Sequence, residues 1–146
     1  MKIERQAPLL PLDGADMQRG PGERLQLGRL AEDVIARYYR EEFGFDVRAQ
    51  NLRLGPYELD VIVQRGQELR IVEVRSSAQR SFNELSWTLV GKKARTLRKA
   101  IREMERRGML ESIESFQVDA ALVRWNKGAR PSIEIWYDIL PGDMGV

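Results

Sequence analysis

The sequence predicts a single α/β (α+β) domain in which helices flank a mixed sheet. Two observations carry this prediction. Apolar residues recur at helical spacing in two stretches, and five shorter runs are rich in β-branched and aromatic residues. Along the chain their order is helix, three strands, helix, two strands. With 146 residues, 42% of them hydrophobic, the chain is long enough to form one domain with a substantial core.

The first helix is expected from Arg24 to about Glu42, where Gly44 supplies a stop. Its apolar residues fall at three- and four-residue intervals. They are Leu27, Leu30, Ala31, Val34, Ile35 and Tyr38. This spacing gives the helix one buried face.

Three strands follow the first helix. They are expected at Phe45 to Leu54, Tyr57 to Gln64 and Glu68 to Arg75, with the turn Gly55-Pro56 after the first. The short turn Arg65-Gly66-Gln67 separates the second and third strands and predicts a β-hairpin.

The second half of the chain repeats the alternation. A helix from about Thr88 to Arg107 is closed by Gly108, and strands are expected at Phe116 to Trp125 and Ile133 to Ile139. Residues 1–23 hold three of the six prolines and three of the twelve glycines, which is typical of an irregular N-terminal arm. We therefore expect an arm at 1–23, a domain at 24–140 and a tail at 141–146.

The composition excludes several kinds of site. The chain has no Cys, which rules out disulfides, thiolate zinc sites and a cysteine nucleophile. It has no His, which rules out a Ser-His-Asp triad and histidine-ligated metals. A metal would have to bind oxygen ligands, which favours Mg, Mn or Ca. No stretch approaches the roughly 20 apolar residues of a membrane span, and we expect a cytoplasmic protein.

Acidic residues interrupt the two most apolar strands. Asp60 lies within the run LDVIV, and Glu73 lies within the run IVEV. A two-residue turn between these strands would place even positions of the first strand on the same face as odd positions of the second. A three-residue turn would separate them. The two-residue turn predicts one face that carries Glu58, Asp60, Glu73 and Arg75.

Two interpretations of these carboxylates stay open. Neighbouring carboxylates in a half-buried sheet repel each other, and a divalent cation such as Mg would relieve that repulsion and activate water. Alternatively, Asp60 and Glu73 lie on a solvated face of the sheet with Arg75 as a salt-bridge partner.

The sequence resembles the YraN-like family, which is uncharacterised and is assigned to the PD-(D/E)XK, restriction-endonuclease-like superfamily. The residues that carry the resemblance lie between about Gly28 and Val123. They are GRLAE at 28–32, QNLR at 50–53, YELDVI at 57–62 and VEVR at 72–75. The resemblance implies an α-β-β-β-α-β core, a nuclease activity that requires Mg²⁺ or Mn²⁺, and DNA as substrate.

The resemblance also assigns roles to individual residues. Asp60 and Glu73 match the metal ligands, while Glu58 and Glu32 match further acidic positions of the site. Arg75 occupies the position of the Lys, and Lys93 resembles a basic residue at the start of the second core helix. Asp119 matches an Asp that we expect to be structural.

Three departures from the family pattern stand out. Arg75 replaces Lys; it stays charged and can stabilise a transition state but cannot readily transfer a proton. Tyr57 and Ala31 stand where the family has Gly. The metal ligands are thus kept while the Lys is lost, which leaves open a weakened nuclease or a silent one that still binds nucleic acid.

The second helix is strongly basic. Residues 88–107 contain eight basic and two acidic residues, whereas the whole chain has 24 and 22. The apolar stripe comprises Val90, Ala94, Leu97, Ile101 and Met104. The opposite pole comprises Lys92, Arg95, Lys99, Arg102 and Arg106. This pole is interpreted either as a phosphate-binding surface or as a solvated helix face.

Two further residues lie close to the predicted site. Lys93 falls at the edge of the apolar stripe, where it would either point toward the sheet and stand in for the lost Lys or extend its charge into water. Trp87, in the polar linker, is the best aromatic candidate for contact with a base or the backbone.

Three functions are compatible with these features. The first is a metal-dependent nuclease that acts on DNA, including branched or structured DNA. The second is a nuclease-fold protein without cleavage activity that binds nucleic acid or a recombination or repair partner. The third is an oligomerisation module paired through the strand Ile133–Ile139. The superfamily resemblance also allows a homodimer.

Overall fold

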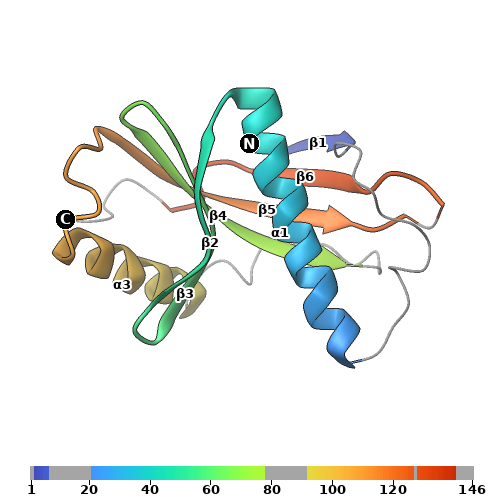
Figure 1. The fold of residues 1–146 in the computed structure, drawn as a ribbon, viewed down its shortest axis with the longest axis horizontal. Helices are drawn as coiled ribbons and strands as arrows, with labels where there is room; N and C mark the ends of the chain where they lie inside the picture. The colour runs from blue at the N-terminus through green and yellow to red at the C-terminus, as the bar shows by residue number, and fades with distance from the viewer. Residues whose placement is uncertain (1, 7–20, 78–91, 127, 141–146) are drawn as a thin grey trace.

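The computed structural model describes residues 2–6, 21–77, 92–126 and 128–140 and confirms the predicted α/β class (Figure 1). Its helices are α1 (Pro21–Phe43) and α3 (Lys92–Arg106). Its strands are β1 (Lys2–Gln6), β2 (Asp46–Leu54), β3 (Tyr57–Arg65), β4 (Glu68–Ser77), β5 (Ser115–Arg124) and β6 (Ser132–Trp136). No helix in these ranges is long and apolar enough to cross a membrane.

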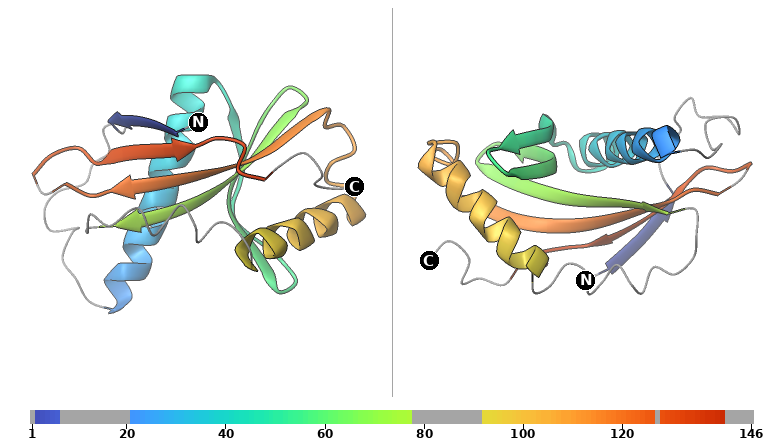
Figure 2. Two further views of the ribbon diagram at one scale, coloured as in Figure 1. Left: turned by 180° about the vertical axis from the view of Figure 1, so that it is seen from behind. Right: turned by 90° about the horizontal axis from the view of Figure 1, so that it is seen from below.

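The six strands form one mixed sheet in the order β1-β6-β5-β4-β3-β2. Strands β4 and β5 are parallel, and every other neighbouring pair is antiparallel. Helix α3 lies in the connection between the two parallel strands, as a crossover requires. Figure 2 shows α1 on one face of the sheet and α3 on the other, consistent with a restriction-endonuclease-like core.

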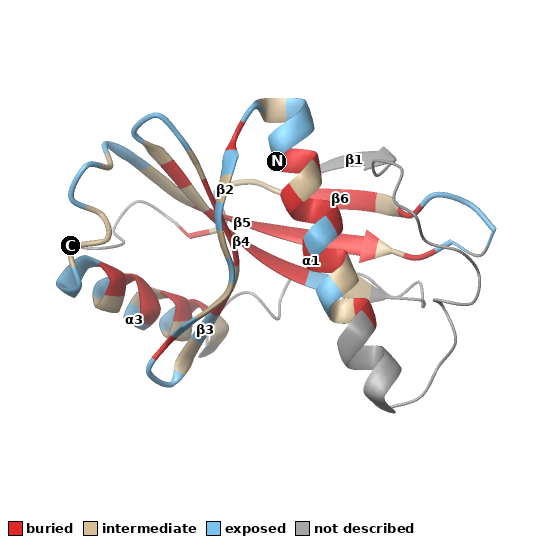
Figure 3. Cartoon of the chain, in the orientation of Figure 1, coloured by how far each residue is buried: buried red, intermediate tan, exposed pale blue. Residues whose placement is uncertain are grey.

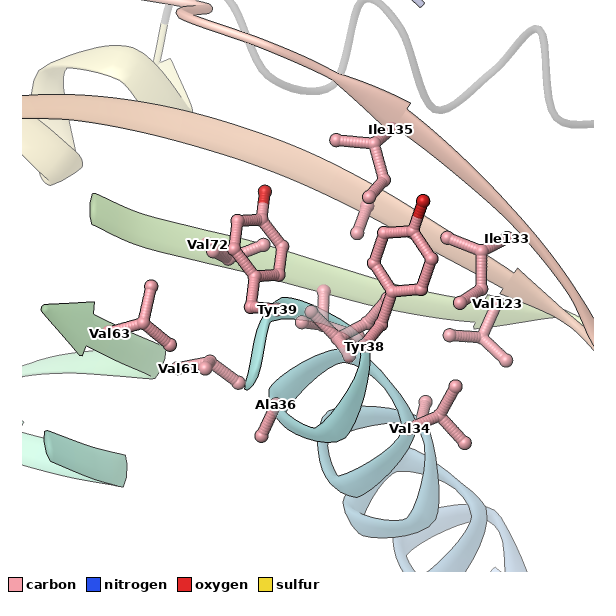
Figure 4. Packing of buried hydrophobic residues seen from close by; sticks show 14 of the residues in the cluster. Val34, Ala36, Tyr38, Tyr39, Val61, Val63, Val72, Val123, Ile133 and Ile135 are labelled. Carbon is pink, nitrogen blue, oxygen red and sulfur yellow. The ribbon is translucent and has the colours of Figure 1, made fainter. Parts of the chain in front are cut away.

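Helix α1 buries one side against the sheet. Val34 and Tyr39 pack with strand residues such as Val61, Val72 and Val123 in a single apolar cluster (Figure 4). The helix ends where expected. Gly44 adopts a φ of 75°, and its N–H donates to the Arg40 carbonyl at 3.1 Å.

Helix α3 packs on the opposite face of the sheet. The stripe predicted from the sequence is confirmed for Ala94, Leu97, Ile101 and Met104, all of which are buried, while Val90 lies outside the described residues. These side chains share a cluster with residues of β2, β3 and β4, including Leu54, Leu59 and Ile71. Figure 3 shows the resulting division of α3 into a buried and an exposed side.

The chain ends differ from the sequence prediction. Lys2–Gln6, placed in an irregular arm, form strand β1, which pairs with β6 in the register Ile3↔Ile135. A five-residue segment with one apolar residue, Ile3, carries no strand pattern of its own, and the open edge of β6 decides its conformation. Strand β6 is therefore not a free pairing edge, which removes the basis for the proposed oligomerisation module.

The last strand is also shorter than predicted. It ends at Trp136 because Asp138 adopts a φ of 55° and donates its N–H to the Asp119 carboxylate at 2.9 Å. The Ile139 N–H then donates to the Val118 carbonyl at 2.8 Å, so the chain turns back over β5.

Candidate metal and nucleic-acid site

The hairpin between β3 and β4 has the predicted two-residue turn. Its register pairs Arg65 with Glu68 and Val61 with Val72, which confirms the parity deduced from the sequence. Leu69 and Ile71 of β4 belong to the cluster under α3. Because side chains alternate along a strand, Glu73 continues this face.

Strand β3 pairs with β4 from Val61 onward, so Asp60 lies just outside the paired segment. The paired residues end at Val61 and Val72, and the first half of β3 follows β2 toward α3 (Figure 1). The Asp60 side chain compensates for the lost pairing, because its Oδ2 accepts a hydrogen bond from the Val74 N–H at 2.9 Å. The carboxylate is thereby held against β4.

Glu73 is the most deeply buried of the predicted ligands, with only 3% of its surface exposed. Its Oε1 lies 2.9 Å from the Nζ of Lys93, which extends from the first turn of α3. Its Oε2 is buried and has no hydrogen-bond partner within the described ranges. Buried carboxylate oxygens are normally paired, and an unpaired one indicates a missing cation or donor.

The electrostatics of Asp60 reflect this crowding. Burial, followed by repulsion from Glu73 and from Glu32, raises the pKa of Asp60 to about 7. The hydrogen bond from Val74 and the charge of Lys93 oppose that shift only in part. Asp60 therefore exchanges its proton near neutral pH.

Glu32 reaches the same region from α1. Its side chain is 8% exposed, its Oε1 has no partner in the part of the chain that the structure describes, and burial raises its pKa. A side-chain hydrogen bond with Asn51 opposes this increase. Asn51 belongs to the QNLR segment at 50–53, whose sequence pattern gives it no role. The signal was the residue type, since Asn tolerates the φ of 55° observed here.

Glu58 and Arg75 lie outside the buried cluster. Both are exposed, and the Glu58 carboxylate lies 3.9 Å from Arg53. Arg75 forms no ion pair with any other described residue. The structure therefore brings together Asp60, Glu73 and Lys93, with Glu32 nearby, and does not bring Glu58 or Arg75 into contact with them.

Oxygen ligands of this kind suit a small divalent cation. Within the described residues, no three carboxylates lie close enough together to enclose a metal by themselves. Mg²⁺ does not need such a cage, because it typically binds one or two carboxylates and completes its shell with water and substrate phosphate. Asp60 and the unpaired oxygen of Glu73 fit this requirement.

The exposed side of α3 is less uniform than predicted. Arg95, Lys99 and Arg102 are exposed and form no ion pair with other described residues, whereas Arg106 pairs with Glu103. Hydrogen bonds from Arg106 and Arg107 lower the pKa of Glu103 to about 2. The basic pole therefore has an acidic partner at this end of the helix, because Glu103 lies one turn before Arg106. The Lys92 side chain and Trp87 lie outside the described residues.

Comparison with known proteins identifies the family of the chain. Residues 31–123, more than half of the chain, match the model of the uncharacterised protein family UPF0102. The chain belongs to the UPF0102 family. The resemblance to the YraN-like family is thereby confirmed, and the matched segment contains Glu32, Asp60, Glu73 and Lys93.

Several UPF0102 proteins are similar to the chain. One from Sorangium cellulosum is 27% identical over 114 residues, which cover 77% of this chain and 78% of the relative. One from Carboxydothermus hydrogenoformans is 33% identical over 79 residues, covering 54% and 66%. One from Frankia casuarinae is 34% identical over 73 residues, covering 50% and 61%. Their names give the family and no activity.

Proposed function

We propose that this UPF0102 protein is a divalent-metal-dependent nuclease that acts on DNA. The observation that carries the proposal is the unpaired, buried Oε2 of Glu73 beside a half-buried Asp60 whose pKa is raised to about 7. A purely structural pair of carboxylates would be stabilised by donors, whereas this pair keeps acceptor capacity for a cation.

Asp60 and Glu73 would hold Mg²⁺ or Mn²⁺, with Glu32 assisting through water. The bound metal would supply an activated water and neutralise charge on the scissile phosphate. Lys93, which lies 2.9 Å from Glu73, would contact a phosphate oxygen, and Arg75 lies exposed on the same strand as Glu73.

Branched or structured DNA is the finer form of the substrate proposal. Arg95, Lys99 and Arg102 project from α3, the helix whose first turn carries Lys93. A backbone bound along this helix would lead a phosphodiester toward the carboxylates. Such contacts are electrostatic and independent of sequence, and they weaken as salt rises.

A second function has its own support. Arg75 replaces the family's Lys and is exposed, which is compatible with a silent nuclease fold that binds nucleic acid or a recombination or repair partner. In that case the basic side of α3 would be the functional surface, and the carboxylates would be inherited features of the fold.

Cleavage assays separate the two functions. Linear, single-stranded and branched DNA are incubated with Mg²⁺ or Mn²⁺ and wild type, Asp60→Asn or the control Asp46→Asn, which alters an exposed Asp of β2. We expect wild type and the control to cleave and Asp60→Asn to lose at least about a hundredfold in rate. Binding by all three proteins without cleavage would favour the silent fold.

Charge reversal tests the basic surface in both cases. Lys99→Glu with Arg102→Glu should weaken DNA binding by about tenfold or more at low salt and reduce its salt dependence. Arg40→Glu, an exposed change on α1, is the control and should leave binding within about twofold of wild type. Equal losses in both proteins would exclude α3 as the specific contact surface.

Arg75→Lys tests the missing Lys directly. Because Lys93 already lies 2.9 Å from Glu73, we expect Arg75→Lys to change cleavage less than Lys93→Met does. An inert wild type that gains activity with Arg75→Lys would instead identify a decayed site.

A further inference from the structure

Lys93 is the counter-ion of the buried carboxylates. Among the described residues it is the one basic group in ion-pair contact with Asp60 or Glu73, at 2.9 Å from Glu73 Oε1. Glu73 is 3% exposed, so the charge of Lys93 compensates a carboxylate that water barely reaches. Removing such a partner leaves an uncompensated buried charge.

The position of Lys93 also conflicts with a bound cation. A divalent ion on Asp60 and Glu73 would lie beside the oxygen that the ammonium already occupies. Two positive groups at one carboxylate repel strongly in a site of low dielectric.

We propose that Lys93 is an exchangeable counter-ion, which neutralises Glu73 in the metal-free protein and is transferred to a substrate phosphate when a divalent cation binds the same carboxylate. This inference rests on the proposed function, since it concerns the same carboxylates. It makes metal binding and phosphate binding mutually dependent, because each favours the same displaced position of one ammonium.

The side chain is suited to this exchange. The Lys93 side chain is 29% exposed, so its ammonium has a route to solvent. Its flexible four-carbon stem, anchored in the first turn of α3, can adopt other rotamers that carry the ammonium away from Glu73. Arg75 is exposed and forms no ion pair with the carboxylates that the structure describes, so it does not duplicate the contact. The exposed cations of α3, Arg95 and Lys99, lie beyond Lys93 along the helix and would hold the flanking backbone.

The test is metal binding without nucleic acid. Binding of Mn²⁺ or Ca²⁺ is measured by titration calorimetry at pH 8 for wild type, Lys93→Met and Arg40→Met. Removal of the competing ammonium should tighten metal binding by about tenfold in Lys93→Met. The control removes an exposed charge from α1, outside the surface proposed to bind DNA, and should stay within about twofold of wild type.

Thermal unfolding supplies a second readout. Lys93→Met should unfold at a lower temperature than wild type without metal and should gain more from added Ca²⁺, because the ion replaces the missing charge. If Lys93→Met does not fold, Lys93→Gln removes the charge and keeps a hydrogen-bond donor, and it should show the same tightening.

Mutual dependence is measured with a short single-stranded oligonucleotide and Ca²⁺. The oligonucleotide should raise the affinity of wild type for Ca²⁺ more than it raises that of Lys93→Met, since only wild type has an ammonium to transfer. An equal increase in both proteins would overturn the exchange.

The outcomes separate this inference from the proposed function. Tighter metal binding by Lys93→Met, with no cleavage by wild type, would support the exchange and contradict the nuclease. Equal or weaker metal binding by Lys93→Met and Lys93→Gln would overturn the exchange and leave the nuclease standing. Failure of wild type and both variants to bind metal would overturn both.

Discussion

Two buried acidic centres lie on opposite faces of the sheet and differ in how completely their carboxylate oxygens are hydrogen-bonded. Asp119 of β5 is fully buried under α1 and accepts hydrogen bonds from the Tyr39 hydroxyl at 2.6 Å, Gln117 Nε2 at 2.8 Å and the Asp138 N–H at 2.9 Å. Arg70 adds an ion pair at 3.6 Å. On the α3 face, Glu73 has Lys93 on one oxygen and leaves the other unpaired.

The difference shows how to distinguish a structural carboxylate from a functional candidate. Burial costs desolvation free energy at both centres. It raises the pKa of Asp119 on the α1 face and that of Asp60 on the α3 face. Only Asp119 recovers that cost through a complete set of donors. An unpaired acceptor beside a second carboxylate with a raised pKa, more than burial alone, therefore marks the α3 face as the candidate site.

The largest expected effect on stability is at Asp119. Asp119→Ala leaves the Tyr39 hydroxyl and the Arg70 guanidinium without their acceptor, and we expect it to lower the free energy of unfolding by about 3 kcal/mol. Urea denaturation measures the change. A loss below about 1 kcal/mol would mean that the network is dispensable and would break the contrast between the two faces.

Asp60→Asn should raise the free energy of unfolding, the opposite of Asp119→Ala. The amide oxygen can still accept the Val74 N–H, while repulsion from Glu73 disappears, so we expect the free energy of unfolding at pH 8 to rise by about 2 kcal/mol. Urea denaturation beside the control Asp46→Asn measures it. A destabilisation as large as that of Asp119→Ala would assign Asp60 a structural role.

The stability difference between Asp60→Asn and wild type should depend on pH. The pKa of Asp60 is about 7 in the folded protein and near 3.8 in the unfolded chain, so the folded state holds the proton more tightly. Wild type therefore loses stability as pH rises from about 4 to about 7. Asp60→Asn lacks this contribution, and its advantage over wild type should grow across that window and level off above pH 7. A constant difference from pH 4.5 to pH 8 would contradict the raised pKa.

The smallest expected effect is at Tyr39. Tyr39→Phe removes one donor from Asp119 and keeps the ring, which packs edge-on against Phe45 and Phe43, so we expect a loss of about 1.5 kcal/mol. Cleavage and metal binding should be unchanged, because the network lies on the face opposite Glu73. Altered metal binding would show that the two centres are coupled through the sheet.

Much of the candidate site was accessible from the sequence. Strand alternation and a two-residue turn were enough to place Asp60 and Glu73 on one face, because both are local properties of the chain. The helical period placed Lys93 at the edge of the apolar stripe but left open whether it points toward the sheet or into water. The order of helices and strands and the family resemblance followed from the same local signals.

What the sequence left undecided depends on contacts between distant segments. Tyr39 and Asp119 are 80 positions apart, and only the packing of α1 on β5 brings them together. Whether Lys93 or Arg75 reaches Glu73 depends on where α3 crosses the sheet, and the conformation of Lys2–Gln6 depends on the edge of β6. Local patterns fix which face a side chain occupies, whereas its partner depends on how helices and strands pack. The unpaired oxygen of Glu73 was therefore visible only in the tertiary structure.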